Sequence, residues 1–106
     1  MIEYIHWSIQ AEGSYGHIID YMTDEFGATR TRRYIEKVHK EVNKLLKHPQ
    51  LGPIEPWLEG SRYEFRQLVI EHLTKIIYRV TDNSIEIADV WDVRKDPKEL
   101  VARFKK

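Results

Sequence analysis

Three strand-like segments follow one another closely in the second half of the chain, and they constrain the fold more than any other feature. Residues 62–69, 73–80 and 85–93 each alternate apolar with polar or charged side chains, the pattern of a β-strand with one buried face. An Asp82-Asn83 turn signal stands at the second of the two short links. Links this short join only antiparallel neighbours, because a parallel connection needs a long crossover. The segments therefore predict an antiparallel sheet.

The first half of the chain predicts a short strand followed by two helices. Residues 2–7 alternate like a strand, and Ser8 is placed to cap a helix whose apolar side chains recur every three or four residues. Gly27 can end that helix in a left-handed conformation. A second helix is expected over residues 28–47, before Pro49 stops it. The very short link between the helices predicts an antiparallel helical hairpin.

The last segment completes the predicted fold. Asp96 is placed as a helix cap, Pro97 suits the first helical position, and Glu99 completes a capping box. The order of strand, helix, helix, three strands and a short C-terminal helix predicts an α+β fold, with the helical hairpin packed on one face of a largely antiparallel sheet. We expect residues 1–106 to form a single domain, with the other sheet face open and carrying basic side chains.

The composition excludes several classes of protein. No apolar run approaches the ~18–20 residues of a membrane span, and the N-terminus has no signal-peptide pattern, so we expect a cytoplasmic protein without a membrane partner. Cysteine is absent, the common nucleotide-binding and hydrolase motifs are missing, and the histidines show no metal-ligand spacing. The sequence therefore predicts no metal site and no cofactor.

The net charge of zero hides a separation of charge along the chain. Residues 1–27 carry five acids and no Lys or Arg, whereas residues 28–48 carry seven bases against Glu36 and Glu41. A non-specific nucleic-acid binder is usually basic overall, because the counterions that it releases supply its affinity. Any nucleic-acid contact of this chain must therefore be local. The seven bases form either a solvated helix face or part of a binding surface.

Basic side chains also interrupt the two strands of the predicted central hairpin and follow the third strand: Arg62, Arg66, Lys75, Arg79 and Arg94. Residues two or four apart on a strand share a face, so these charges are expected to converge at one end of the sheet. Such a cluster can hold a scissile phosphate and stabilise the charge that develops in phosphoryl transfer, with Glu55 in the preceding loop as a base. The alternative is an ion-paired sheet surface in which Glu64 neutralises its neighbours.

Several short motifs, in one order along nearly the whole chain, resemble the RelE/ParE toxin superfamily of bacterial toxin–antitoxin modules. They read "IHWSIQA", "IIDYM", "LLKHPQLG", "RYEFRQL", "KIIYRV" and "IEIADVWDVRKDP". The resemblance implies a compact α+β toxin that a cognate antitoxin holds inactive. Members act either by cutting mRNA in the ribosomal A site or by poisoning DNA gyrase, and the sequence leaves both targets open.

The resemblance also implies roles for particular residues. Lys75 falls where RNA-cleaving members usually place a catalytic Arg, Arg66 where they carry a basic residue, and Arg94 where they have Arg, Lys or Tyr. Glu55 resembles the general base of one branch, although Val93 stands where that branch has His. If the chain is an enzyme, it is expected to be a metal-independent, ribosome-dependent mRNA endonuclease. If it binds gyrase, the same bases would serve binding alone, and in either case Arg62 and Arg79 are expected to help bind the target.

The basic second helix suggests where the antitoxin binds. An acidic, amphipathic antitoxin tail is expected to dock across the helical hairpin and the sheet edge, with Arg33, Lys37 and Lys40 as its contacts. The competing class is a non-toxic protein-interaction module that uses the same fold as a scaffold. Growth arrest on induced expression separates the two.

Overall fold

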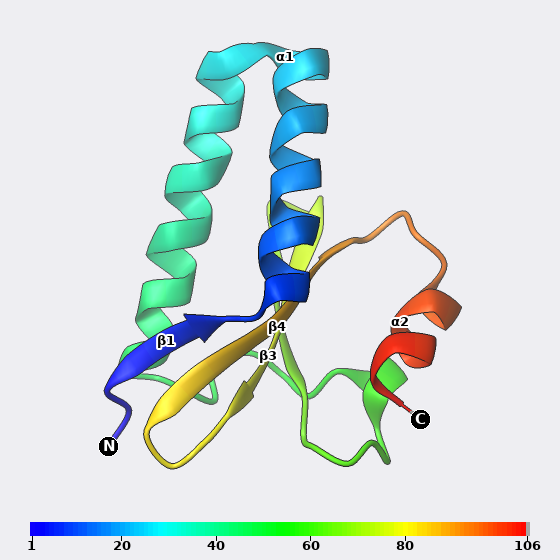
Figure 1. The fold of residues 1–106 in the computed structure, drawn as a ribbon. Coiled ribbons are helices and arrows are strands. Elements are labelled where there is room, and N and C mark those ends of the chain that lie inside the picture. Colours follow the sequence, from blue (N-terminus) through cyan, green and yellow to red (C-terminus); the bar gives the residue numbers. More distant parts are fainter. Residues whose placement is uncertain (106) are drawn as a thin grey trace.

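The fold is α+β, as the element order predicts, with a helical hairpin on one face of a four-stranded sheet and a short helix against the other (Figure 1). The computed structural model describes residues 1–105, so Lys106, the last residue of the expected domain, lies outside the described part. In chain order the elements are β1 (Tyr4–Trp7), α1 (Ile9–Asn43), the 3₁₀ turns η1 (Lys44–Leu46) and η2 (Pro56–Leu58), β2 (Arg66–Ile70), β3 (Thr74–Val80), β4 (Ser84–Asp92) and α2 (Pro97–Phe104).

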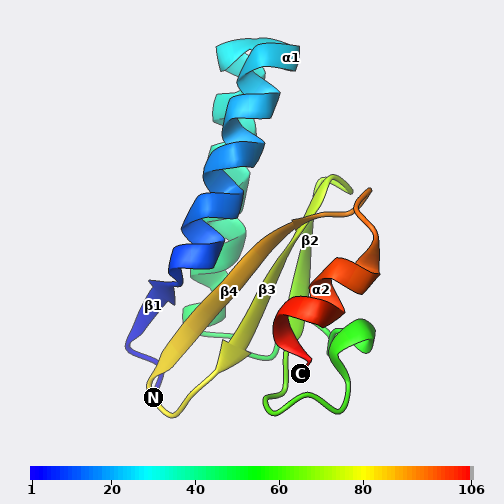
Figure 2. The same cartoon turned by 45° about the vertical axis from the view of Figure 1, so that its right-hand side comes forward.

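The sheet is antiparallel except at one edge, and its strand order is β1-β4-β3-β2 (Figure 2). β2 pairs with β3 and β3 with β4 in antiparallel register, as predicted, whereas β1 runs parallel to β4. β2 and β3 are joined by a tight loop in which Glu71 and His72 take positive φ angles of 54° and 59°. This loop places Ile70 opposite Thr74 and so fixes which side chains of β2 and β3 share a face.

α1 consists of two antiparallel arms rather than one straight helix (Figure 1). The first arm begins after Ser8, whose hydroxyl oxygen accepts a hydrogen bond from the Ala11 amide at 3.0 Å. The helix breaks at Gly27, where φ is 84° and ψ is 167°, a conformation that residues with a Cβ avoid. The second arm then runs back to Asn43. The predicted hairpin, its cap and its turn at Gly27 are confirmed.

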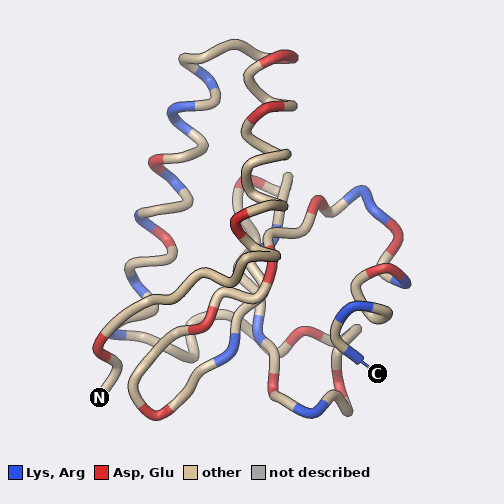
Figure 3. Tube along the Cα trace, viewed as in Figure 1, with Lys and Arg blue, Asp and Glu red and all other residues tan. Residues whose placement is uncertain are grey.

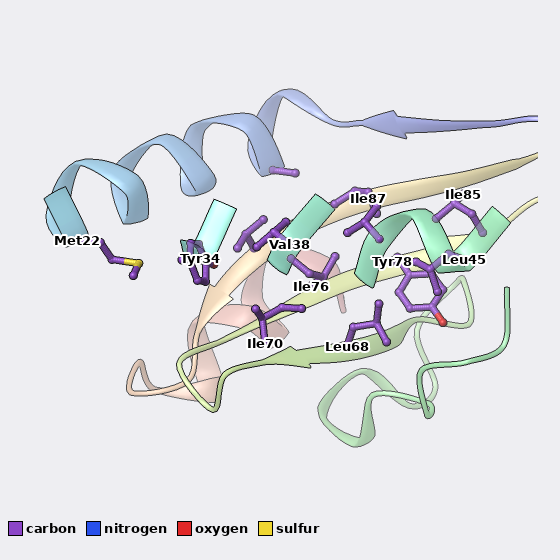
Figure 4. Close-up of a cluster of buried hydrophobic side chains, with 13 residues drawn as sticks. Met22, Tyr34, Val38, Leu45, Leu68, Ile70, Ile76, Tyr78, Ile85 and Ile87 are labelled. Atoms are coloured by element: carbon purple, nitrogen blue, oxygen red, sulfur yellow. The ribbon is translucent and has the colours of Figure 1, made fainter. Parts of the chain in front are cut away.

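The main core lies between the hairpin and the sheet (Figure 4). Met22, Val38, Val42, Tyr78 and Ile87 are buried there, and Ile18 and Ile35 are partly buried against them, whereas Phe26 on the same helical stripe as Met22 is 57% exposed. Inside this interface the Tyr34 hydroxyl and the Thr74 hydroxyl lie 2.7 Å apart in a buried hydrogen bond. This bond ties the second arm to β3 and satisfies both polar groups.

A bulge in β4 decides which of its side chains face the hairpin. The register shifts between Ile77 and Tyr78 of β3, so that Ala88 of β4 has no partner of its own. Because of this extra residue, Ile87 and Val90 both reach the main core although they are three positions apart. Asp89 and Trp91 point to the opposite face of the sheet.

A second, smaller core covers part of that opposite face, which the sequence predicted to be open. Its members are Leu58, Phe65, Ile77, Trp91 and Leu100, with Phe104 packed against them. α2 begins as predicted: Pro97 lies in its first turn, and the Asp96 carboxylate accepts a hydrogen bond from the Lys98 amide at 2.9 Å. These cap signals do not encode where the helix docks, so the prediction of an open face is wrong for the half beneath α2 and η2. The other half, around His6 and Arg79, carries exposed side chains.

Candidate functional site

Lys75 and Glu55 come together, but as a buried ion pair. Lys75 lies on β3 and its ammonium donates a hydrogen bond to Glu55 Oε1. The Glu55 side chain is 0% exposed and that of Lys75 is 14% exposed. The loop that carries Glu55 is held to the strand by a hydrogen bond of 2.9 Å from the Glu55 amide to the Phe65 carbonyl. The charge of Lys75 is therefore directed into the protein.

A second ion pair, with a buried carboxylate and a partly exposed guanidinium, lies on the same face and holds α2 in place. The Arg103 guanidinium of α2 donates to the fully buried Asp89 carboxylate at 2.6 Å, and Asp89 also accepts a hydrogen bond from the Val90 amide at 2.8 Å. The guanidinium of Arg103 lies 5.2 Å from the ring centre of Trp91. Removing Arg103 would leave the buried Asp89 charge uncompensated, so this ion pair stabilises the docking of α2 on the sheet.

Arg66 lies on the other face of the sheet from Lys75. It pairs with Tyr78, whereas Lys75 pairs with Val69, and paired residues of an antiparallel ladder share a face. The Arg66 guanidinium donates to the Gly52 carbonyl at 2.9 Å. The expected convergence of Arg66 with Lys75 is thus wrong, because the loop between β2 and β3 sets a register that separates them.

The hydrogen bond from Arg66 to Gly52 is one of those that hold the loop before η2 against the sheet. We call these hydrogen bonds, made by Arg66 and Tyr78 to Pro49 and Gly52, the loop clamp. The Tyr78 hydroxyl accepts a hydrogen bond from the Gly52 amide at 2.9 Å and donates one to the Pro49 carbonyl at 2.8 Å. Burial raises the pKa of Tyr78 above its ordinary value, so the hydroxyl remains a donor. A Cβ at Gly52 would overlap the carbonyl of Gln67, so the loop approaches β2 as closely as glycine allows.

Arg94 occupies a third place, beyond the end of β4. Its guanidinium binds Asp92 at 2.9 and 3.1 Å and lies 5.3 Å from the ring centre of Tyr21 in the first arm of α1. The hydrogen bond from Arg94 is the main cause that holds the pKa of Asp92 below its ordinary value. Asp92 pairs with Thr74, whose hydroxyl meets the hairpin, so this ion pair borders the hairpin side of the sheet.

Arg62 and Arg79, the expected target-binding residues, do come together. Both guanidinium groups lie against the ring of Tyr63, at 5.4 Å for Arg62 and 4.1 Å for Arg79. Tyr63 is 42% exposed, so the group is open to solvent. The two predicted target-binding residues therefore share one site, where the segment before β2 meets the uncovered part of the sheet.

Sequence reasoning missed a polar network beside these arginines. His6 Nδ1 lies 2.8 Å from Glu86 Oε1, and the Ser84 hydroxyl donates to Glu86 Oε2 at 2.7 Å. Burial alone would raise the pKa of Glu86, but the bonds from Ser84 and His6 and the charge of Arg79 hold it below its ordinary value. The parallel pairing of β1 with β4 brings His6 next to Glu86, and no pattern among neighbouring residues predicts that pairing.

An apolar groove of about 750 Å³ is a second feature that the sequence did not indicate. It runs between the first arm of α1 and the segment that follows β4, and Arg94 stands at its rim. The large apolar side chains exposed along it are Ile9, Tyr21, Phe26, Leu73 and Val93. Their spacing resembles that of buried residues, so only the tertiary structure reveals that nothing in residues 1–105 covers them.

The expected antitoxin contacts lie on the solvent side of the second arm. Arg33, Lys37 and Lys40 are exposed, and Lys37 forms an ion pair with Glu41 at 3.1 Å. Figure 3 shows the separation of charge along the hairpin, with acidic residues on the first arm and basic residues on the second. The three bases thus form a charged face that a partner can reach.

Two further findings concern sites and membranes. Residues 1–105 hold no group of three or more His, Asp or Glu side chains arranged to bind a metal ion. No helix within that range is long and apolar enough to cross a membrane.

Comparisons with known proteins agree with the resemblance seen in the ordered motifs. Residues 5–97 match the family model described as "ParE toxin of type II toxin-antitoxin system, parDE". A chain of the solved "Chromosomal ParDE TA system from P. aeruginosa" is similar in structure, with a TM-score of 0.69 and 18% identity over 87% of this chain and 96% of that chain. At that identity the likeness establishes a shared fold. A search of curated proteins gives no significant match.

Proposed function

We propose that this chain, which belongs to the family of ParE toxins of type II toxin–antitoxin systems, arrests bacterial growth by binding DNA gyrase rather than by cutting mRNA. In this proposal it acts in the cytoplasm and a cognate antitoxin keeps it inactive. Gyrase poisoning is one of the two modes of action in the superfamily that the chain resembles.

The observation that carries the choice of target is the buried pair of Lys75 and Glu55. A phosphoryl-transfer centre needs cations that reach the developing charge on the phosphate and a base that reaches the attacking hydroxyl. Here the candidate cation donates to the candidate base, and Glu55 has no exposed surface. To act on RNA the site would have to open and leave a carboxylate without its partner. This arrangement favours a structural role for both residues.

The positions of the other expected catalytic residues support the same choice. Arg66 binds a backbone carbonyl on the hairpin side of the sheet, and Arg94 is paired with Asp92 at the rim of the groove. Catalysis by proximity requires groups placed around one reacting atom. The three expected cations lie in three places, each bonded to a group within the protein, so they do not surround one scissile phosphate.

For the antitoxin we propose the exposed basic face of the second arm, formed by Arg33, Lys37 and Lys40. An acidic antitoxin segment would be attracted to this face over a distance, which raises its association rate at low salt. Reversal of the three charges should slow association and flatten its dependence on salt. The same change in net charge at Lys47, Lys98 and Lys105, which are exposed elsewhere, is the matched control. If both triple variants bind with the same rates, the antitoxin contacts another surface.

Induced expression in bacteria tests the mode of action. We expect growth arrest, relaxation of a reporter plasmid and intact mRNA on ribosomes, with growth restored by co-expression of the cognate antitoxin. Arg66→Ala, Lys75→Ala and Arg94→Ala are expressed in parallel, and mRNA ends are mapped in each culture. Codon-phased cuts that disappear in these variants would establish the nuclease instead. Unimpeded growth with the wild-type chain would favour the non-toxic interaction module.

A further inference from the structure

A row of side chains crosses the uncovered half of the sheet at one level, from β1 through β4 and β3 to the segment before β2. We call it the cross-strand row; it consists of His6, Glu86, Arg79, Tyr63 and Arg62. His6 is the direct partner of Glu86, and Glu86 of Arg79, so these three side chains share one face. The Arg79 guanidinium lies over the ring of Tyr63, and the Arg62 guanidinium lies against the same ring.

Glu86 and Arg79, in the middle of the row, are held in place by their neighbours. Glu86 is fixed by hydrogen bonds with His6 and Ser84 at 2.8 and 2.7 Å. Arg79 is held against the ring of Tyr63, its guanidinium 4.1 Å from the ring centre. Side chains that are already immobilised lose little conformational entropy on binding, which is the general advantage of a pre-organised site.

The chemistry of the row matches that of protein interfaces. Tyrosine and arginine are among the residue types that most often dominate binding energy, and here exposed Arg62 and half-buried Arg79 both lie against exposed Tyr63. Neither Arg62 nor Arg79 forms an ion pair with a carboxylate of residues 1–105. A guanidinium that lies against a ring keeps N–H groups at its edge for bidentate contact with a carboxylate. Tyr4, 51% exposed on β1, extends the patch beside His6.

We infer that the cross-strand row binds an acidic segment of the toxin's protein target, an inference that rests on the proposed function. The guanidinium groups of Arg62 and Arg79, which form no ion pair within residues 1–105, attract acidic side chains, and the ring of Tyr63 offers apolar contact. Glu86 argues against a nucleic acid, because its pKa is held low and its negative charge faces any phosphate backbone that crosses the row. A protein segment can place its carboxylates on the two arginines and a donor on Glu86.

A titration of the ¹⁵N-labelled full chain tests the inference without knowledge of the target. The probes are a blocked hexapeptide of alternating Glu and Tyr and a single-stranded RNA hexamer. We expect the peptide to shift the amide signals of the row, and Arg79→Glu to abolish those shifts. Arg32→Glu, the same charge change at an exposed position of the second arm, should leave them intact. Shifts that are as strong with RNA, or that spread over every basic surface, would overturn the inference.

A growth-arrest assay is the second test, and it separates this inference from the proposed function. Arg79→Gln and Arg62→Gln should each weaken target binding at least ~tenfold, the effect of losing one hot-spot contact, and so raise survival on induction, with melting temperatures close to that of the wild type. Full toxicity in both variants would refute the row whatever the target is. If the variants lose toxicity while wild-type cells keep normal supercoiling, the row stands and the gyrase assignment fails.

Discussion

Replacement of Lys75 by methionine is the most informative perturbation of the buried face. Methionine keeps the length of the side chain but removes the only hydrogen-bond donor that residues 1–105 offer to the Glu55 carboxylate, whose Oε2 already lacks a partner there. The carboxylate would then be completely buried without compensation. A buried carboxylate in that state is strongly unfavourable, so the folded protein should lose stability.

The expected loss follows from the burial of the two groups. Breaking a buried ion pair by removing one partner costs about 3–5 kcal/mol. The Lys75 side chain keeps 14% of its surface exposed, which favours the lower end, about 3 kcal/mol. In a chain of 106 residues each kcal/mol shifts the melting temperature by about 4–8 °C, so we expect a fall of roughly 12–24 °C.

Urea unfolding followed by far-ultraviolet circular dichroism measures this loss. The double variant Lys75→Met/Glu55→Gln should recover much of it, because the unpaired charge is then gone. Lys98→Met, at an exposed position of α2, should stay within about 0.5 kcal/mol of the wild type. A loss below about 1 kcal/mol for Lys75→Met would refute the reasoning. The Lys75 ammonium could then leave Glu55 at little cost and bind a phosphate. The Lys75–Glu55 pair would no longer be a reason to exclude nuclease activity.

Three further predictions concern the core, the loop clamp and the acid response. Val38→Asp places an unpaired charge in the fully buried core and should abolish the cooperative thermal transition, whereas Val69→Asp, at a position 53% exposed, should melt within a few degrees of the wild type. Gly52→Ala should cost about 1–3 kcal/mol in urea unfolding, since the new Cβ overlaps the carbonyl of Gln67; an unchanged midpoint would show that the loop moves freely. The folded pKa of Asp92 lies below its ordinary 3.8, so its contribution is present above about pH 4 and is lost as the pH falls through the folded value. The stability difference between wild type and Asp92→Asn should therefore shrink in acid, and a difference independent of pH would contradict this.

Local signals in the sequence predicted the type and order of the elements, although the strand expected over residues 62–69 begins at Arg66 and the helix expected over residues 28–47 ends at Asn43. Ser8, Gly27 and Asp96 mark helix ends through hydrogen bonds or backbone angles that depend only on their immediate neighbours. The apolar stripes of the hairpin likewise reflect burial that repeats with the helical period. These features need no knowledge of distant parts of the chain, which is why the hairpin and the terminal helix could be predicted.

The faces of the sheet depend on register, which alternation within one strand does not fix. The order of polar and apolar residues in β2 and β3 was read correctly, but a shift of one residue in their pairing exchanges the faces. The observed pairing of Ile70 with Thr74 puts Arg66 on the hairpin side and Lys75 on the side of α2. The candidate site therefore separated into three places that residue spacing alone could not distinguish.

Long-range pairings account for the remaining differences. The contact of His6 with Glu86 requires β1 to run parallel to β4, and the two strands are separated by most of the chain. The docking of α2 depends on the buried Asp89, which reaches Arg103 because the bulge at Ala88 turns it away from the hairpin. Such pairings are decided by the packing of the whole domain rather than by neighbours in sequence.

The most direct test of the central claim is a supercoiling assay with purified gyrase and the purified full-length chain. The toxin is added in increasing amounts to gyrase, relaxed plasmid and ATP, and the fraction of supercoiled product is measured. In parallel, the same preparation is added to ribosomes programmed with a defined mRNA. We predict that supercoiling falls in a dose-dependent way while the mRNA stays intact. Undiminished supercoiling together with codon-phased cleavage of the mRNA would contradict it.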